Sequence, residues 1–92
     1  MIEDSVRRAK SLIMEFNLGV EYETALDGIR TELSNLYLKP KTGEATDKLL
    51  SDCEETIREL IKCIEEKDKE RVKRSISLLR DRIADLRSEF RR

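Results

Sequence analysis

The chain has 92 residues, the length of one small domain or of half of a symmetric assembly. Charged residues make up 42% of it and hydrophobic residues 38%, and it contains neither histidine nor tryptophan. The absence of histidine excludes His-based catalytic triads, His metal ligands and His general acid–base chemistry. The length excludes Rossmann and barrel enzymes, and the composition points to no single function.

Several features predict a cytoplasmic protein with no membrane partner. Residues 1–4 include two acids and no apolar stretch typical of a signal peptide follows them. The longest apolar run, residues 12–14, is too short to span a bilayer. Cys53 and Cys63 lie ten residues apart, which on one helix separates their Cα atoms by about 15 Å, beyond disulfide reach. We therefore expect both cysteines to be reduced and to fill apolar space.

Apolar residues recur at alternating intervals of three and four, which is helical periodicity. We predict helices over about 2–17, 20–38, 46–66 and 69–91. Asn17 and Gly19 favour a helix end, and Pro40 marks a loop. A turn at 66–68, with Asp68 as the next N-cap, keeps the charged residues that follow out of the apolar seam. One long helix from about 46 to 91 is the competing interpretation.

Folding the last two predicted helices about residue 68 pairs apolar residues along their whole length. The pairs are Ile64 with Val72, Leu60 with Ile76, Ile57 with Leu79, Cys53 with Ile83 and Leu50 with Leu86. The predicted fold class is therefore all-α: a single domain over residues 1–92, folded as an up-down antiparallel four-helix bundle of two helical hairpins. Because the core is small, dimerisation would complete or extend it. The apolar residues outside the seams that would face a partner are Met14, Leu18, Val20, Leu38 and Leu78.

The last helix has a basic edge. Residues 67–92 carry a net charge of +5 and residues 1–66 a net charge of −6, by count of Lys, Arg, Asp and Glu. Lys73, Arg80 and Arg87 repeat every seven residues, so they lie on one side of a helix. This edge could contact nucleic acid. The favoured interpretation is intramolecular: Arg80 opposite Glu54, and Arg87 opposite Asp47, across the hairpin seam.

Acidic residues on the last two helices suggest a third hypothesis. All-α nucleotide pyrophosphatases of the MazG type hold a divalent metal with an EExxE run on one helix and ExxD on the next. This chain is similar to them in architecture only, because Arg58 stands where the third acid of the run belongs. We therefore interpret these acids as a solvated face. They are Glu54, Glu55, Glu59, Asp81 and Asp85.

The sequence thus predicts a small helical-bundle protein, not an enzyme, that acts through protein–protein association, in the first place as a homodimer. It shows no catalytic residue, metal ligand, cofactor site or small-molecule substrate. A nucleic-acid accessory role for the basic edge is the alternative, and a metal-dependent phosphohydrolase ranks below it. The expected interaction residues are Lys73, Arg80, Arg87, Met14, Leu38 and Leu78.

Overall fold

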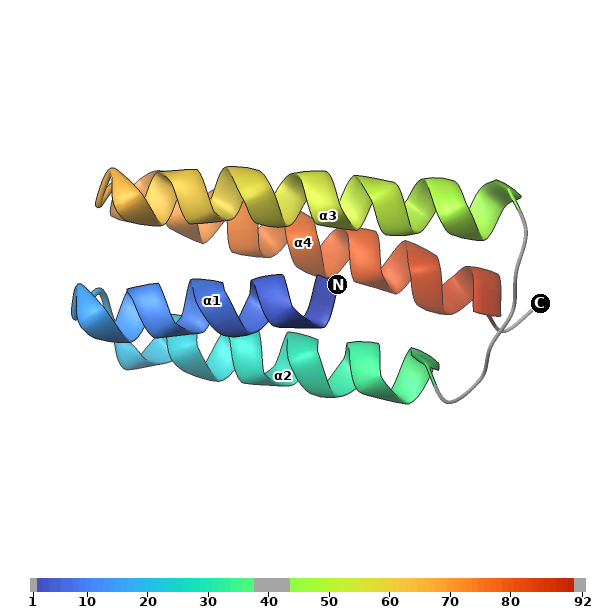
Figure 1. Ribbon diagram of the computed structural model, residues 1–92, viewed down its shortest axis with the longest axis horizontal. Coiled ribbons are helices and arrows are strands. Elements are labelled where there is room, and N and C mark those ends of the chain that lie inside the picture. Colours follow the sequence, from blue (N-terminus) through green and yellow to red (C-terminus); the bar gives the residue numbers. More distant parts are fainter. Residues whose placement is uncertain (1, 38–43, 91–92) are drawn as a thin grey trace.

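The computed structural model describes residues 2–37 and 44–90, and within them it consists of four α-helices and no strand. The helices are α1 (Ile2–Glu15), α2 (Val20–Tyr37), α3 (Glu44–Glu65) and α4 (Lys69–Phe90). They lie side by side in a bundle that measures 38 × 19 × 18 Å (Figure 1). The predicted all-α four-helix fold is confirmed. The predicted helix ends at 38 and 91 lie outside the described residues, and the others lie within two residues of the observed ends.

The first hairpin turns through a Schellman motif at the end of α1. Asn17 adopts a left-handed conformation, with φ of 54°. The Leu18 N–H donates to the Ile13 carbonyl at 3.1 Å, and the Asn17 N–H donates to the Met14 carbonyl at 3.1 Å. In this motif an apolar residue after the left-handed position packs back onto the helix. Leu18 is accordingly only 7% exposed, so the expectation that it faces a partner is wrong.

The second hairpin turns through the same motif at residues 66–68. Lys67 is left-handed, with φ of 58°, and the Asp68 N–H donates to the Cys63 carbonyl at 3.2 Å. The Asp68 carboxylate then accepts a hydrogen bond from the Arg71 N–H at 3.2 Å, which caps the first turn of α4. The predicted turn and N-cap are confirmed, and the alternative of one long helix is wrong.

The hairpins pack side by side with both turns at the same end of the bundle (Figure 1). α1 contacts α2 and α3, and α4 contacts α3 and α2. For the diagonal pairs, α1 with α4 and α2 with α3, no described Cα atoms come within 8 Å of each other. Helices are antiparallel within each hairpin, but α1 runs parallel to α3 and α2 runs parallel to α4. At the shared end the Lys67 ammonium lies 5.0 Å from the centroid of the Phe16 ring, which links the two turns.

The core lies between the two hairpins of a single chain. All residues of the predicted α3–α4 pairs are buried except Leu50, which is partly buried against the same cluster. α1 and α2 contribute one face each to this cluster, with Ile13, Leu26 and Leu33 fully buried. The two cysteines are unbridged and buried within it. Hydrophobic burial is non-directional. The shared core therefore explains why the two hairpins pack together, but not which helix of one hairpin lies beside which helix of the other.

Candidate functional site: the groove between α2 and α4

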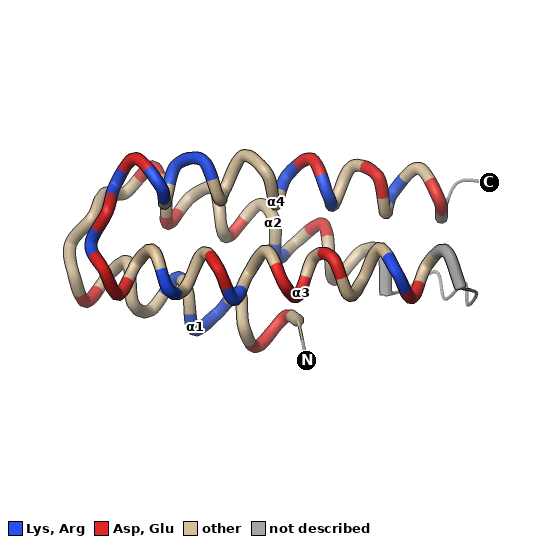
Figure 2. Tube along the Cα trace, turned by 90° about the horizontal axis from the view of Figure 1, so that it is seen from above, with Lys and Arg blue, Asp and Glu red and all other residues tan. Residues whose placement is uncertain are grey.

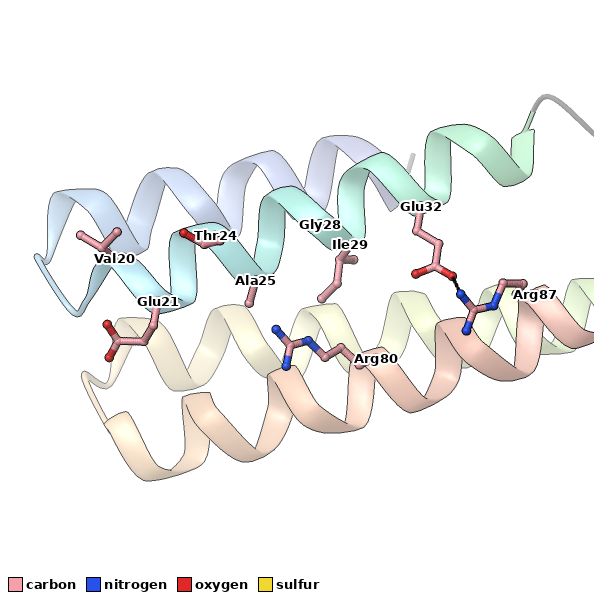
Figure 3. A pocket seen from close by; sticks show the side chains of 9 residues that line it. All are labelled: Val20, Glu21, Thr24, Ala25, Gly28, Ile29, Glu32, Arg80 and Arg87. Atoms are coloured by element: carbon pink, nitrogen blue, oxygen red, sulfur yellow. Dashed lines mark ion pairs between the residues drawn. The ribbon is translucent and has the colours of Figure 1, made fainter.

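Among the four neighbouring helix pairs, α2 and α4 have the fewest positions at which their described backbones come close together. A groove of about 590 Å³ runs along the seam between them, lined from one side by α2 and from the other by α4 (Figure 3). A smaller hollow of about 300 Å³ extends it and shares Glu21, Ala25 and Arg80 with it. The two hollows together form one surface feature, which we call the α2–α4 groove.

Three small residues lie in the middle of the α2 wall of the groove, between Glu21 at one end and Ile29 and Glu32 at the other. Thr24, Ala25 and Gly28 succeed one another along it, and Thr24 and Gly28 are exposed. A Cβ atom added to Gly28 would meet nothing within 4 Å. Val20, at the start of α2, lies at the turn end of the groove and is 72% exposed. The α2 side of the groove is therefore a low wall of short side chains, and the apolar side chain of Val20 is exposed at its turn end.

The basic edge of α4 forms the opposite wall. Lys73, Arg80 and Arg87 all line the groove, as their seven-residue spacing requires for one side of a helix. Arg87 crosses the groove and forms an ion pair with Glu32 of α2 at 2.6 Å. Arg80 extends between the two helices (Figure 3). Neither Arg80 nor Lys73 forms an ion pair with any residue that the structure describes.

Glu21, the acid nearest the turn end, does not neutralise this stripe. Its carboxylate folds over Gly19, where both oxygens lie 2.8 Å from the position that a Cβ would occupy. Gly19 itself has φ of 152°, a conformation open to glycine and strained for other residues. Figure 3 shows the Glu21 carboxylate on the side of the turn, away from Arg80. The middle of the groove is thus positively charged.

The structure corrects the charge pairs expected for this edge. Across the described residues, no ion pair joins Arg80 to Glu54 or Arg87 to Asp47. α4 packs against two helices, and the edge that carries Arg80 and Arg87 faces α2 rather than α3. The ion pairs that do link α4 to α3 are Arg71 with Glu59 at 2.8 Å and Arg82 with Asp52 at 3.8 Å.

The structure does not gather the apolar interaction candidates into one face. Met14 is 56% exposed on α1 and Leu78 is 45% exposed on α4. These two helices stand at diagonal corners of the bundle. Leu78 borders a shallow hollow between α3 and α4 that is lined mostly by charged residues, among them Glu55 and Arg58. Leu38 lies outside the described residues.

The acidic residues considered for a metal site point outward. Glu54, Glu55, Asp81 and Asp85 are exposed. Glu59, also exposed, accepts a hydrogen bond from Arg71 at 2.8 Å. In the described parts of the chain, no three His, Cys, Asp or Glu residues come close enough to hold a metal ion.

The cysteines occupy apolar surroundings. Burial raises the pKa of the Cys53 thiol to about 11, although nearby Arg82 acts in the opposite direction. The Cys63 sulfur lies 3.8 Å from the Ser75 hydroxyl across the α3–α4 seam. A thiol that ionises only at so high a pH is a weak nucleophile at neutral pH.

Sequence reasoning found the cations of the groove but missed its other wall. Thr24 and Gly28 belong to no apolar seam, so periodicity gave them no role. The available signal was a glycine within a helical pattern, a position that costs about 1 kcal/mol relative to alanine.

Comparisons with family models, with curated proteins and with solved structures found no match to this chain. None of the described helices has both the length and the apolar character needed to cross a membrane. The function is therefore argued from the groove itself.

Proposed function

We propose that the protein acts by binding a helical segment of another protein along the α2–α4 groove. The observation that carries this proposal is the combination of a low wall of small residues with cations that lack an ion-pair partner among the described residues. A surface of that kind leaves room for backbone approach and supplies charge for orientation.

Gly28 supports a helix as the bound element. Glycine within a helix destabilises it by about 1 kcal/mol relative to alanine, and no neighbour in the described chain needs the space at Gly28. Thr24 and Gly28 lie one helical turn apart, so they leave a shallow track on one side of α2. A third helix can lie in such a track, because small residues let helix backbones approach closely.

The charge of the groove favours a partner other than a second copy. A two-fold symmetric dimer places the same surface on both sides of the interface. If two α2–α4 grooves met in this way, the stripe of Lys73 and Arg80 would face its own counterpart. Glu32 is already paired with Arg87 and offers little compensation. A homodimer therefore stays a prediction for the oligomeric state to test, and it ranks below a different protein here.

Nucleic acid is the weaker alternative. Arg71, Arg82 and Arg87 are held by carboxylates of the same chain. Glu21 and Glu32 border the groove at its two ends and would repel a continuous phosphate backbone. We also propose that binding takes place in the cytoplasm, because free cysteines are usual in a reducing compartment.

Site-specific cross-linking tests the proposal, with Thr24 as the probe and Ser51 as the control. Thr24 is exposed within the groove, whereas Ser51 is exposed on α3, which does not border the groove. Each is replaced in turn by a photoreactive benzophenone amino acid, and the variants are irradiated in the native cells. We expect a discrete protein adduct from position 24 and not from position 51.

Mass spectrometry identifies the adduct, and Gly28→Gln is its control because the longer side chain fills the groove. Loss of the adduct in this variant, with an unchanged circular dichroism spectrum, supports the proposal. Equal adducts from both positions, or no adduct from position 24, would overturn it. An adduct that nuclease removes would favour nucleic acid, and an adduct of twice the chain mass would favour the homodimer.

A further inference from the structure

The cations of α4 fall into two groups that differ in what they contact. Those directed toward α3, and Arg87 at the far end of the groove, meet carboxylates of the same chain at 2.6–3.8 Å. The other four, Lys69, Lys73, Arg74 and Arg80, are exposed and form no ion pair with described residues. Of these four, Lys73 and Arg80 line the groove. Figure 2 shows that basic residues are most frequent in the half of α4 next to the turn.

The two helices beside α4 are acidic, yet they leave this pair of cations unneutralised. α4 has seven basic and four acidic residues, whereas α2 has one basic and four acidic residues. Among the four acids of α2, Asp27 binds Lys10 at 2.8 Å and Glu32 binds Arg87. Glu23 lines neither hollow of the groove. Glu21 folds toward its own turn. The missing countercharge for the groove must therefore come from solvent ions or from a partner.

The spacing of Lys73 and Arg80 specifies how far apart the acidic groups of a partner must lie. Seven residues along a helix span about 10.5 Å and return to nearly the same side. A partner helix parallel or antiparallel to α4 repeats the same spacing when two carboxylates stand seven residues apart. Between the two cations the groove is lined by Ala25 and Ile76, which suits apolar side chains between the two acids.

Resting on the proposed function, we infer that the groove selects an acidic amphipathic helix, with two carboxylates seven residues apart that bind Lys73 and Arg80. Arginine gives the stronger contact of the two, since its planar guanidinium can bind a carboxylate through two hydrogen bonds. The small wall at Thr24 and Gly28 then holds the partner backbone close to α2. The two cations thus select an acidic partner, and the small residues of α2 determine how closely the partner helix approaches.

Synthetic helical peptides of 21 residues serve as probes. One carries an alanine and leucine face with two glutamates seven residues apart, the second carries glutamines at those two positions, and the third carries the two glutamates five residues apart. Binding is measured by titration of the isotope-labelled full chain, from the amide shifts of α2 and α4. We expect the first peptide to bind about five- to tenfold more tightly than the others, the size of two solvent-exposed ion pairs.

Charge variants of the protein make the test specific. In the double variant Lys73→Gln/Arg80→Gln, the advantage of the first peptide should disappear. The control is Arg74→Gln, which removes an exposed cation of the same helix that does not line the groove. This control should leave all three affinities unchanged. Gly28→Gln should weaken all three peptides by a similar factor.

The outcomes separate the inference from the proposal on which it rests. If all three peptides shift the groove amides with equal affinity, the acidic selection is wrong and helix binding stands. If none shifts them, or if the first peptide binds away from α2 and α4, the inference is overturned, and the cross-linking at position 24 decides the proposed function independently. An advantage that survives the double variant would also overturn the inference.

Discussion

α4 packs against its two neighbours in different ways. Toward α3, the interior of the seam is filled by large residues such as Ile57, Leu60 and Leu79, all fully buried. Ion pairs lie at its margin, beside a hollow of about 500 Å³ that is lined mostly by charged residues. Toward α2, the facing surface includes Ala25, Thr24 and Gly28, and the groove of about 590 Å³ runs along it. The two seams, which we call the filled seam and the open seam, thus differ in the size and charge of the residues that line them.

Charge pairing also differs between the two sides. On the α3 side, Arg71 and Arg82 lie 2.8 and 3.8 Å from carboxylates of α3. On the α2 side, Arg87 meets Glu32, whereas Arg80 lines the groove and forms no ion pair with described residues. A partner can therefore contact a free cation in the middle of the α2 side.

The largest expected effect comes from a large-to-small change in the filled seam. Leu60→Ala should lower the free energy of unfolding by about 2–5 kcal/mol, because it removes a fully buried side chain and leaves a cavity. The matched change in the open seam, Thr24→Ala, should alter it by less than about 0.5 kcal/mol, since the site is exposed. Urea denaturation followed by circular dichroism measures both. Equal losses in the two variants would show that the α2–α4 seam is packed as tightly as the other.

The filled seam should also protect Cys53 from reagents. With its pKa raised to about 11 by burial, the thiol should resist alkylation at pH 8 in the folded chain and react at an ordinary rate in urea. The folded state holds this proton more tightly than the unfolded state, whose thiol ionises near pH 9. The contribution of Cys53 to the free energy of unfolding should therefore be constant below pH 9 and fall as the pH rises from 9 toward 11. A Cys63→Ala background isolates the Cys53 signal, and rapid alkylation at pH 8 would contradict the burial.

In the open seam, Gly28→Ala should separate stability from binding. It should raise the free energy of unfolding by about 0.5–1 kcal/mol, because alanine favours the helix and its Cβ meets no neighbour in the described chain. The same methyl group lies in the groove, so it should weaken partner binding or leave it unchanged. Thermal unfolding measures the first effect. A loss of stability would show that the glycine is needed by the fold itself, and the argument for a docking helix would lose one support.

The sequence was sufficient to predict every helix and the packing of α3 against α4, for a physical reason. Burial of large apolar residues with helical period fixes which face of each helix is inward, as in Ile57 and Leu79. The left-handed positions at Asn17 and Lys67 then fix where the hairpins turn. Apolar periodicity and turn residues are both local along the chain, so they can be recognised without knowledge of the tertiary structure.

Only the α4 side of the candidate site could be predicted from the sequence. The seven-residue spacing identified Lys73, Arg80 and Arg87 as one edge, but not which helix that edge faces. Deciding between α2 and α3 requires the order in which the hairpins pack, and that order depends on the packing of the whole core. Small residues such as Gly28 carry no apolar periodicity, so periodicity could not identify the α2 wall of the groove.

The smallest expected effects concern the ion pairs on the two sides of α4. Asp52→Asn removes the carboxylate that meets Arg82, and Glu32→Gln removes the one that meets Arg87. Each should cost about 0–1 kcal/mol at low salt and less at high salt, because both pairs are partly exposed. Glu32→Gln should have a second consequence: it leaves a third cation free in the groove. The 21-residue peptide with glutamates seven residues apart should then bind more tightly to Glu32→Gln and with unchanged affinity to Asp52→Asn. Tighter binding to both variants would indicate that total charge, rather than the groove, governs the interaction.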